Sequence, residues 1–170
     1  MQCDAARHSS SISSQSRVII DPIRSFFVQI TLNELLGLGV YQLVLDSENP
    51  TGAQYLAFVS GRNPDGKYWC PDVSRNMDAI RSSVMNAGGN LLEIEVGEMA
   101  HWKDPRHPLR MDYRFTLKAI PTLMLWRPSN DKDERGELAR LDTILSDRTM
   151  TQEALAAEID KFVQNTRNLF

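Results

Sequence analysis

Residues 67–73 read KYWCPDV, and the segments on either side of this stretch decide which fold it belongs to. The preceding residues 54–60 (QYLAFVS) are short, apolar and β-prone, which predicts a buried strand. Apolar side chains then recur at intervals of three, four or one, as the buried face of a helix requires: Val73, Met77, Ile80, Val84 and Met85. The stretch therefore joins a predicted strand to a predicted helix, with Cys70 where the helix begins.

The segments that follow this helix predict further strands and a closing helix. Three of them have the composition of strands: residues 91–96 (LLEIEV), 120–126 (IPTLMLW) and 136–144. A short helix is expected over residues 109–115, and an amphipathic helix is expected to begin at Thr149 or Thr151. Its buried face would carry Leu155, Ile159, Phe162 and Val163.

The segments before the heptapeptide predict one more strand and one more helix. Residues 25–30 (SFFVQI) are β-prone, and Thr31 with Glu34 has the pattern of a capping box that opens a helix over residues 32–45. Helical crossovers between the early strands imply parallel pairing, and the short last connection suits an antiparallel hairpin. The sequence thus predicts an α/β fold, a central mixed β-sheet flanked by helices.

Composition limits both the domain organisation and the class of partner. The chain has 170 residues, 42% of them hydrophobic, which suits one domain; we expect it over residues 25–166, with an N-terminal tail (1–24) and a C-terminal tail (167–170). The N-terminal tail is expected to be disordered or to bind a partner. A net charge of -3 gives no reason to expect nucleic acid, and no apolar run approaches the length of a membrane span.

Three motifs in a fixed order carry a resemblance to a known family. They are residues 67–72 (KYWCPD), residues 96–98 (VGE) with 102–105 (WKDP), and residues 117–123 (LKAIPTL). Together they resemble the thioredoxin domain-containing protein 17 family, cytosolic thioredoxin-related disulfide reductases whose signature is Trp-Cys-Pro-Asp-Cys. The resemblance covers about residues 25–163 and implies a thioredoxin-like fold, with Trp69, Cys70, Pro71 and Asp72 in the active-site turn.

The chain departs from that signature at its last position, where Val73 replaces the second cysteine. In a dithiol reductase the first thiolate attacks the substrate disulfide, and the second thiol then releases the product from the mixed disulfide. Valine cannot perform the second step, although it fills a similar apolar volume in the helix. We therefore expect the fold without the dithiol cycle.

Cys70 is the candidate nucleophile of this degenerate site. The start of a helix favours a thiolate through its unpaired N–H groups and its macrodipole, whereas Asp72 adds an opposing negative charge nearby. An inert cysteine left from a redox ancestor is the alternative. Cys3, the second cysteine of the chain, is the candidate for a distant resolving thiol.

The resemblance also implies a substrate-docking surface. Pro121 is expected to be a cis-proline beside the active-site turn, with Ile120 and Thr122 flanking it. Trp102 is a candidate aromatic contact of this surface or, alternatively, a residue of the core or packed surface. Residues 54–60 contain no acid corresponding to the one that ordinary thioredoxins carry on that strand.

Several other polar side chains have two interpretations. Lys67 and Lys103 are candidates for an anionic ligand such as a glutathione carboxylate, or are solvated surface lysines. His101 and His107 do not have the spacing of a zinc motif, so no metal site is predicted.

Two functions from different classes follow. In the first, Cys70 is a monothiol that forms mixed disulfides with a protein partner, with no bound cofactor and with glutathione as the candidate co-substrate. In the second, the domain is a redox-inactive structural or interaction subunit of a larger assembly, held through its tail. With two cysteines a reducing compartment fits, so we expect the cytoplasm; the alternatives are the mitochondrial matrix, suggested by the Ser-rich tail, or a cytoskeletal or ciliary assembly.

Overall fold

The computed structural model describes residues 19–20, 26–32, 53–127 and 136–169 of the chain. Within these residues six strands form one sheet in the order β1-β2-β4-β3-β5-β6. They are β1 (Ile19–Ile20), β2 (Phe26–Thr31), β3 (Gln54–Val59), β4 (Asn90–Glu95), β5 (Thr122–Trp126) and β6 (Glu137–Leu141). The central strands β2, β4 and β3 are parallel, whereas β1, β5 and β6 pair antiparallel to their neighbours.

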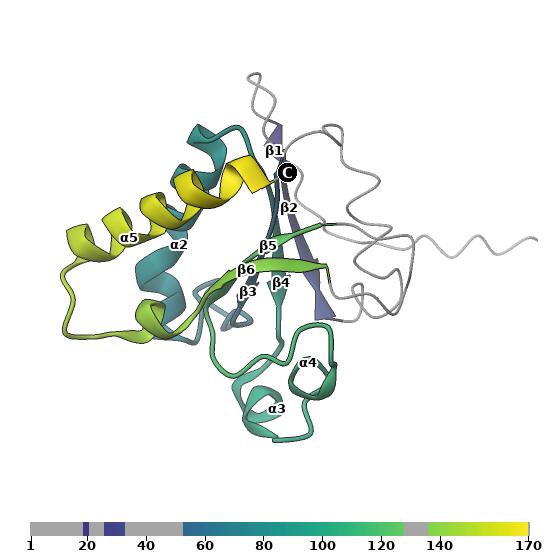
Figure 1. The fold of residues 1–170 in the computed structure, drawn as a ribbon. Helices are drawn as coiled ribbons and strands as arrows, with labels where there is room; N and C mark the ends of the chain where they lie inside the picture. The colour runs from purple at the N-terminus through teal and green to yellow at the C-terminus, as the bar shows by residue number, and fades with distance from the viewer. Residues whose placement is uncertain (1–18, 21–25, 33–52, 128–135, 170) are drawn as a thin grey trace, which may run out of the picture.

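Two long helices cover one face of this sheet (Figure 1). They are α2 (Pro71–Asn86) and α5 (Gln152–Thr166), which pack side by side. Two short helices, α3 (Met99–Lys103) and α4 (Pro108–Met111), lie beyond one end of the sheet, between β4 and β5 in the chain. The 3₁₀ helices η1 (Thr143–Ser146) and η2 (Arg167–Leu169) lie before and after α5.

Burial explains why β3 and α2 form where the sequence predicts them. Every residue of β3 is buried, which matches a strand with neighbours on both sides. On α2 the buried positions include Val73, Met77, Ile80 and Val84, so its apolar stripe faces the sheet. The predicted α/β architecture, with parallel early strands and a final antiparallel hairpin, is confirmed.

Several boundaries differ from the prediction. Strand β1 lies within the predicted N-terminal tail and pairs with β2. It was not predicted, because a strand of two residues is too short to show an alternating pattern. Helix α3 was not predicted, and α4 is shorter than the expected helix over residues 109–115. The last predicted strand ends at Leu141, where the chain turns into η1.

Other predictions fall outside the described residues. They include most of the helix over residues 32–45 and most of the N-terminal tail. The predicted C-terminal tail begins as η2, which directly continues α5.

Candidate active site

Cys70 stands at the junction between the β3–α2 loop and helix α2. It is the N-cap residue of α2, with an extended backbone (φ -94°, ψ 118°), and Pro71 occupies the first turn. The backbone N–H of Cys70 donates to Ser60 Oγ at 3.3 Å, and the Cys70 carbonyl accepts from the Ser74 N–H at 3.2 Å. The buried end of β3 therefore holds the cysteine backbone, while its thiol is half-buried.

The loop before β5 brings a second predicted segment to the same place. The Ile120–Pro121 peptide bond is cis, and Cys70 Sγ lies 4.0 Å from the Ile120 carbonyl oxygen. Ile120 and Thr122 are both buried, and the Thr122 hydroxyl donates to the Ala119 carbonyl at 2.8 Å. What this loop presents to Cys70 is thus backbone rather than long side chains.

Val73, which the resemblance aligns with the family's second cysteine, is fully buried. It belongs to the hydrophobic core that α2 forms with the sheet. The apolar replacement is therefore accommodated by packing, as the sequence predicts.

Trp69 is anchored by a close approach of two glycine backbones. Its indole N–H donates to the Gly97 carbonyl at 2.8 Å, and the same carbonyl accepts from the Gly61 N–H at 3.0 Å. A Cβ on Gly61 would come within 2.6 Å of the Gly97 oxygen, so only glycine permits this contact. The partly exposed Trp69 ring is thereby fixed beside Cys70.

The structure does not support Trp102 as a docking contact. Its side chain is only 6% exposed, because the Arg110 guanidinium covers the ring at 3.9 Å and His107 packs edge-on at 5.1 Å. A substrate would have to displace Arg110 to reach it. Trp102 is a packing residue of the α3–α4 segment.

The two histidines lie in the same segment, with their rings tilted against each other and the ring centroids 4.6 Å apart. His107 is buried, and both of its ring nitrogens are occupied: Nδ1 accepts from the Leu109 N–H, which leaves Nε2–H to donate to the Val96 carbonyl. Burial lowers the pKa of His107. His107 therefore organises the turn into α4 and has no free nitrogen for a metal ion.

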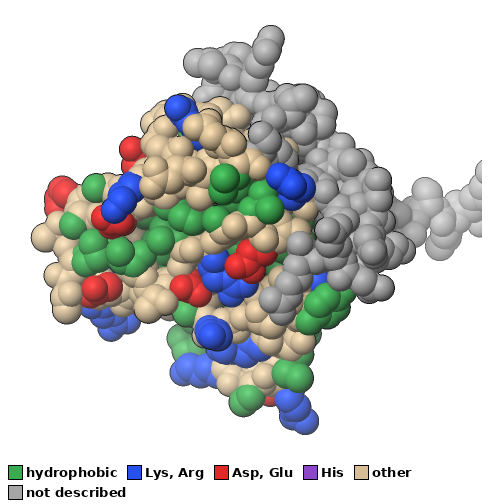
Figure 2. Space-filling view, viewed as in Figure 1, with side chains coloured by type: hydrophobic (Ala, Val, Ile, Leu, Met, Phe, Trp, Pro, Cys, Tyr) green, Lys and Arg blue, Asp and Glu red, His purple; other side chains and the backbone are tan. Residues whose placement is uncertain are grey.

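The candidate anion-binding lysines are both exposed. Lys67 Nζ lies 3.8 Å from the Asp65 carboxylate, an ion pair open to solvent. Lys103 is at the end of α3 in a region where Lys and Arg side chains gather over α3 and α4 (Figure 2). A role of either lysine in ligand binding stays a prediction.

Tyr68, the residue before Trp69, belongs to a buried cluster of charged side chains that the sequence did not predict. The Tyr68 hydroxyl donates to Glu93 Oε2 at 3.0 Å and accepts from Arg62 and Arg81. Arg81 also holds the fully buried Glu93 carboxylate with two hydrogen bonds of 2.6 and 3.0 Å. Burial, followed by the charge of Glu93, raises the pKa of Tyr68 to about 12, so the phenol stays neutral.

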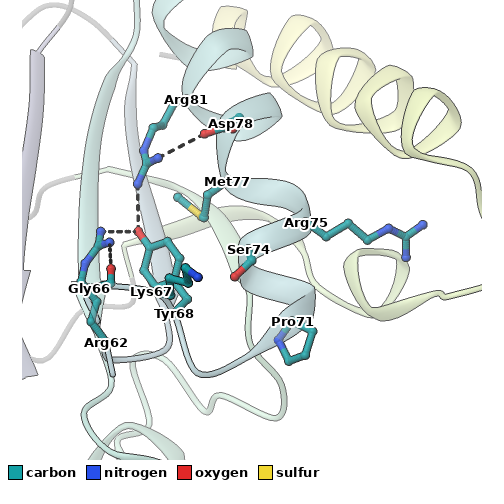
Figure 3. A pocket seen from close by; sticks show the side chains of 10 residues that line it. All are labelled: Arg62, Gly66, Lys67, Tyr68, Pro71, Ser74, Arg75, Met77, Asp78 and Arg81. Atoms are coloured by element: carbon teal, nitrogen blue, oxygen red, sulfur yellow. Dashed lines mark hydrogen bonds and ion pairs between the residues drawn. The ribbon is translucent and has the colours of Figure 1, made fainter. Parts of the chain in front are cut away.

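An open groove of about 770 Å³ runs beside the first turns of α2, between that helix and the β3–α2 loop (Figure 3). Pro71, Met77 and Tyr68 provide apolar surface, and charged side chains of both signs surround it. Its arginines are already engaged, since Arg62 pairs with Glu95 and Arg81 with Glu93. The groove adjoins the active-site turn, and Lys67 and Arg75 add two further cations to its lining.

Sequence reasoning found Cys70 and the Pro121 loop but missed the residues that hold them. Ser60 and Glu93 belong to predicted strands and Gly97 to the 96–98 motif, but their contacts with Cys70, Tyr68 and Trp69 were not predicted. The one available signal was composition, since Glu93 is an acid inside the apolar run of residues 91–96.

A cysteine that caps a helix after a buried strand, packed against the loop that opens a later antiparallel strand, defines a thioredoxin-like domain. The thioredoxin domain of the thioredoxin domain-containing protein 17-like family matches residues 39–146, and the chain belongs to this family. Within the described residues, no helix is both long and apolar enough to cross a membrane.

Curated relatives agree with this assignment. The thioredoxin-like protein Clot of Arabidopsis thaliana is 30% identical over 50% of this chain and 66% of its own length. Clot of Oryza sativa subsp. japonica is 36% identical over 42% of this chain and 56% of its own length. Thioredoxin domain-containing protein 17 of Mus musculus is 30% identical over 55% of this chain and 77% of its own length. The chain thus spans less than two thirds of the plant relatives and about three quarters of the mouse protein.

Proposed function

We propose that this protein carries out thiol–disulfide exchange through Cys70 alone and has no dithiol reductase cycle. The observation that supports this most directly is the contrast between the two positions of the motif. Cys70 is a half-buried thiol at the exposed start of α2, whereas Val73 is fully buried in the core. Among the described residues Cys70 is the free cysteine, and the Val73 side chain has no thiol that could resolve a mixed disulfide.

The proposed reaction needs a second thiol from solution. The Cys70 thiolate attacks one sulfur of a protein disulfide, the S–S bond breaks, and the other sulfur leaves as a thiolate that takes up a proton. A free thiol, for which glutathione is our candidate, then attacks the mixed disulfide and regenerates Cys70. After the two steps one substrate sulfur is a free thiol, and the other forms a mixed disulfide with the incoming thiol. The number of disulfide bonds is unchanged, so the reaction needs no electrons from a cofactor.

The loop at Pro121 is the proposed docking surface for that substrate. Because Ile120 and Thr122 are buried, an extended peptide would meet the backbone of this loop rather than their side chains. The partly exposed Trp69 ring, fixed by Gly97, supplies an apolar contact on the other side of Cys70.

A redox-inactive interaction domain is the second candidate, and Val73 favours it directly. A fully packed valine stabilises the fold while removing the family's reaction, which is what selection for binding alone would permit. A free thiol in either role suits a reducing compartment, and we propose the cytoplasm.

Insulin-disulfide reduction coupled to thioredoxin reductase tests the missing dithiol cycle. The wild-type chain is expected to show no turnover above background, and Val73→Cys is expected to restore it because Cys70 and its supporting contacts are in place. Val73→Ala is the matched control, since it also shrinks the side chain but adds no thiol. Robust turnover by the wild type would overturn the proposal.

Mass spectrometry of the protein trapped with an alkylating reagent in its cells separates the two candidates. Glutathione or a partner protein on Cys70, lost in Cys70→Ser but kept in Cys3→Ser, supports the monothiol. A persistently unmodified Cys70 in a chain that co-purifies with a stable complex would instead support the interaction domain.

A further inference from the structure

We propose that Arg148 is a positioning residue that sets the reactivity of Cys70 through Asp72. The inference rests on the proposed function in one respect, that Cys70 is the reacting thiol. Arg148 comes from the connection between η1 and α5 and belongs to none of the motifs around Cys70.

Arg148 holds the carboxylate of Asp72 at two points. Its Nε lies 3.2 Å from Oδ1 and its Nη2 lies 3.4 Å from Oδ2, so the guanidinium meets the carboxylate side-on. The Asp72 side chain is 15% exposed and that of Arg148 is 73% exposed. A carboxylate with so little access to water keeps much of its influence on neighbouring charges, because solvent screens it poorly.

A second arginine places Arg148 there. The Arg75 guanidinium, one turn along α2, donates to the carbonyls of Asp147 and Met150, which bracket Arg148 in the chain. Gln152 returns a hydrogen bond to the Arg75 carbonyl, and Asp147 stabilises the same loop by accepting from Thr149. The loop is thus docked on α2 by contacts that do not depend on the Asp72–Arg148 ion pair.

The charge balance at the active-site turn gives this pair its consequence. The N-terminus of α2 favours a thiolate at Cys70, and the negative charge of Asp72, two residues on, disfavours it. Other charged groups on the packed elements are engaged elsewhere: Arg75 with backbone carbonyls, Asp147 with Thr149 and Lys67 with Asp65. In the described part of the chain, Arg148 is the cation that compensates Asp72.

The rate at which iodoacetamide alkylates Cys70 between pH 5 and 9, measured on the full chain in a Cys3→Ser background, tests the inference. Arg148→Gln leaves Asp72 uncompensated, so we expect alkylation about threefold slower at pH 7 and a pH profile displaced upward. Asp72→Asn is expected to speed alkylation, and adding Arg148→Gln to Asp72→Asn is expected to slow it by much less than threefold, because Arg148 acts through the Asp72 charge. Arg148→Lys keeps the charge and should recover most of the rate.

Two controls separate this inference from the proposed function. Arg106→Gln breaks an exposed Arg–Asp pair in the α3–α4 connection and is expected to leave the rate unchanged. If Cys70 in the parent chain is not alkylated at all while folded, the proposed function fails. If it is alkylated but Arg148→Gln and Asp72→Asn both match the parent, or if their effects simply add, Arg148 has no such role.

Discussion

Two arginine–carboxylate pairs lie on either side of Cys70. The Arg81–Glu93 pair contacts Tyr68, two residues before the cysteine, and the Arg148–Asp72 pair includes the residue two positions after it. In the first, the Glu93 side chain is 0% exposed and that of Arg81 31% exposed, with a shortest contact of 2.6 Å. In the second, Asp72 and Arg148 are 15% and 73% exposed and 3.2 Å apart. Both pairs join an arginine to a carboxylate, but the burial of the two carboxylates and of the two arginines differs.

The difference separates a structural role from an electrostatic one. A buried carboxylate must keep all of its partners, because an unmatched charge inside the protein costs several kcal/mol. The Asp72–Arg148 pair contributes little to folding, because Arg148 is mostly exposed and stays solvated with or without its partner. The Glu93 cluster should therefore govern stability, and the Asp72–Arg148 pair should govern the charge beside Cys70.

Glu93→Gln tests the buried side and has the largest expected effect. The neutral amide removes the charge that pairs with Arg81 and turns an NH₂ group toward a donor, so the free energy of unfolding should fall by about 3 kcal/mol. Urea denaturation followed by circular dichroism measures it. Asp78→Asn is the matched control: Asp78 also contacts Arg81, at 3.4 Å, but its side chain is 96% exposed, so no measurable loss is expected.

Tyr68→Phe removes only the hydrogen bonds of the phenol from the same cluster, so its expected effect is smaller. The ring remains, including its stacking with Arg62 at 4.2 Å, while Glu93 loses one donor and two arginines lose an acceptor. We expect a loss of about 1–2 kcal/mol in the free energy of unfolding, measured by the same denaturation. A variant as stable as the wild type would show that Arg81 alone satisfies Glu93.

Alkaline pH sharpens the assignment to the Tyr68 hydroxyl. Its pKa is raised to about 12 in the folded protein, above the ordinary value of 10.0, so the neutral phenol is favoured by folding. This contribution is complete below pH 10.0 and is lost as the pH rises toward about 12. Denaturation midpoints between pH 9 and 11.5 should fall more steeply for the wild type than for Tyr68→Phe. Parallel curves would contradict the role of the phenol.

The sequence predicts those parts of this site that depend on residues close together in the chain. A buried strand, a Trp-Cys-Pro turn and an amphipathic helix follow from local pattern, and Val73 on the buried face of α2 follows from helical spacing. The contact of Cys70 with the Pro121 loop was predicted from family resemblance, since fifty residues separate them.

The parts that the sequence does not predict depend on where distant segments meet. Arg148 binds Asp72 of α2, and Arg75 of α2 binds the loop that carries Arg148, with more than seventy residues between the partners in each case. Nothing in the local sequence distinguishes Arg148 from a solvated arginine. Trp102 is a related case: the sequence left open an aromatic contact or a packed residue, and the structure shows it packed, with Arg110 over the ring. Which ion pairs form and which side chains are covered depend on tertiary contacts. The spacing of apolar residues along the sequence does not predict these contacts.

Arg148→Gln completes the comparison with the smallest expected effect on folding. Because the side chain is 73% exposed and Arg75 docks the loop independently, the free energy of unfolding should change by no more than about 0.5 kcal/mol. The same variant is the one in which we expect slower alkylation of Cys70, so stability and reactivity would move separately. Raising the salt concentration should shrink its effect on alkylation, since screening weakens the uncompensated charge of Asp72. A loss of stability as large as that of Glu93→Gln would mean that both pairs are structural, and the distinction between the two flanks of Cys70 would not hold.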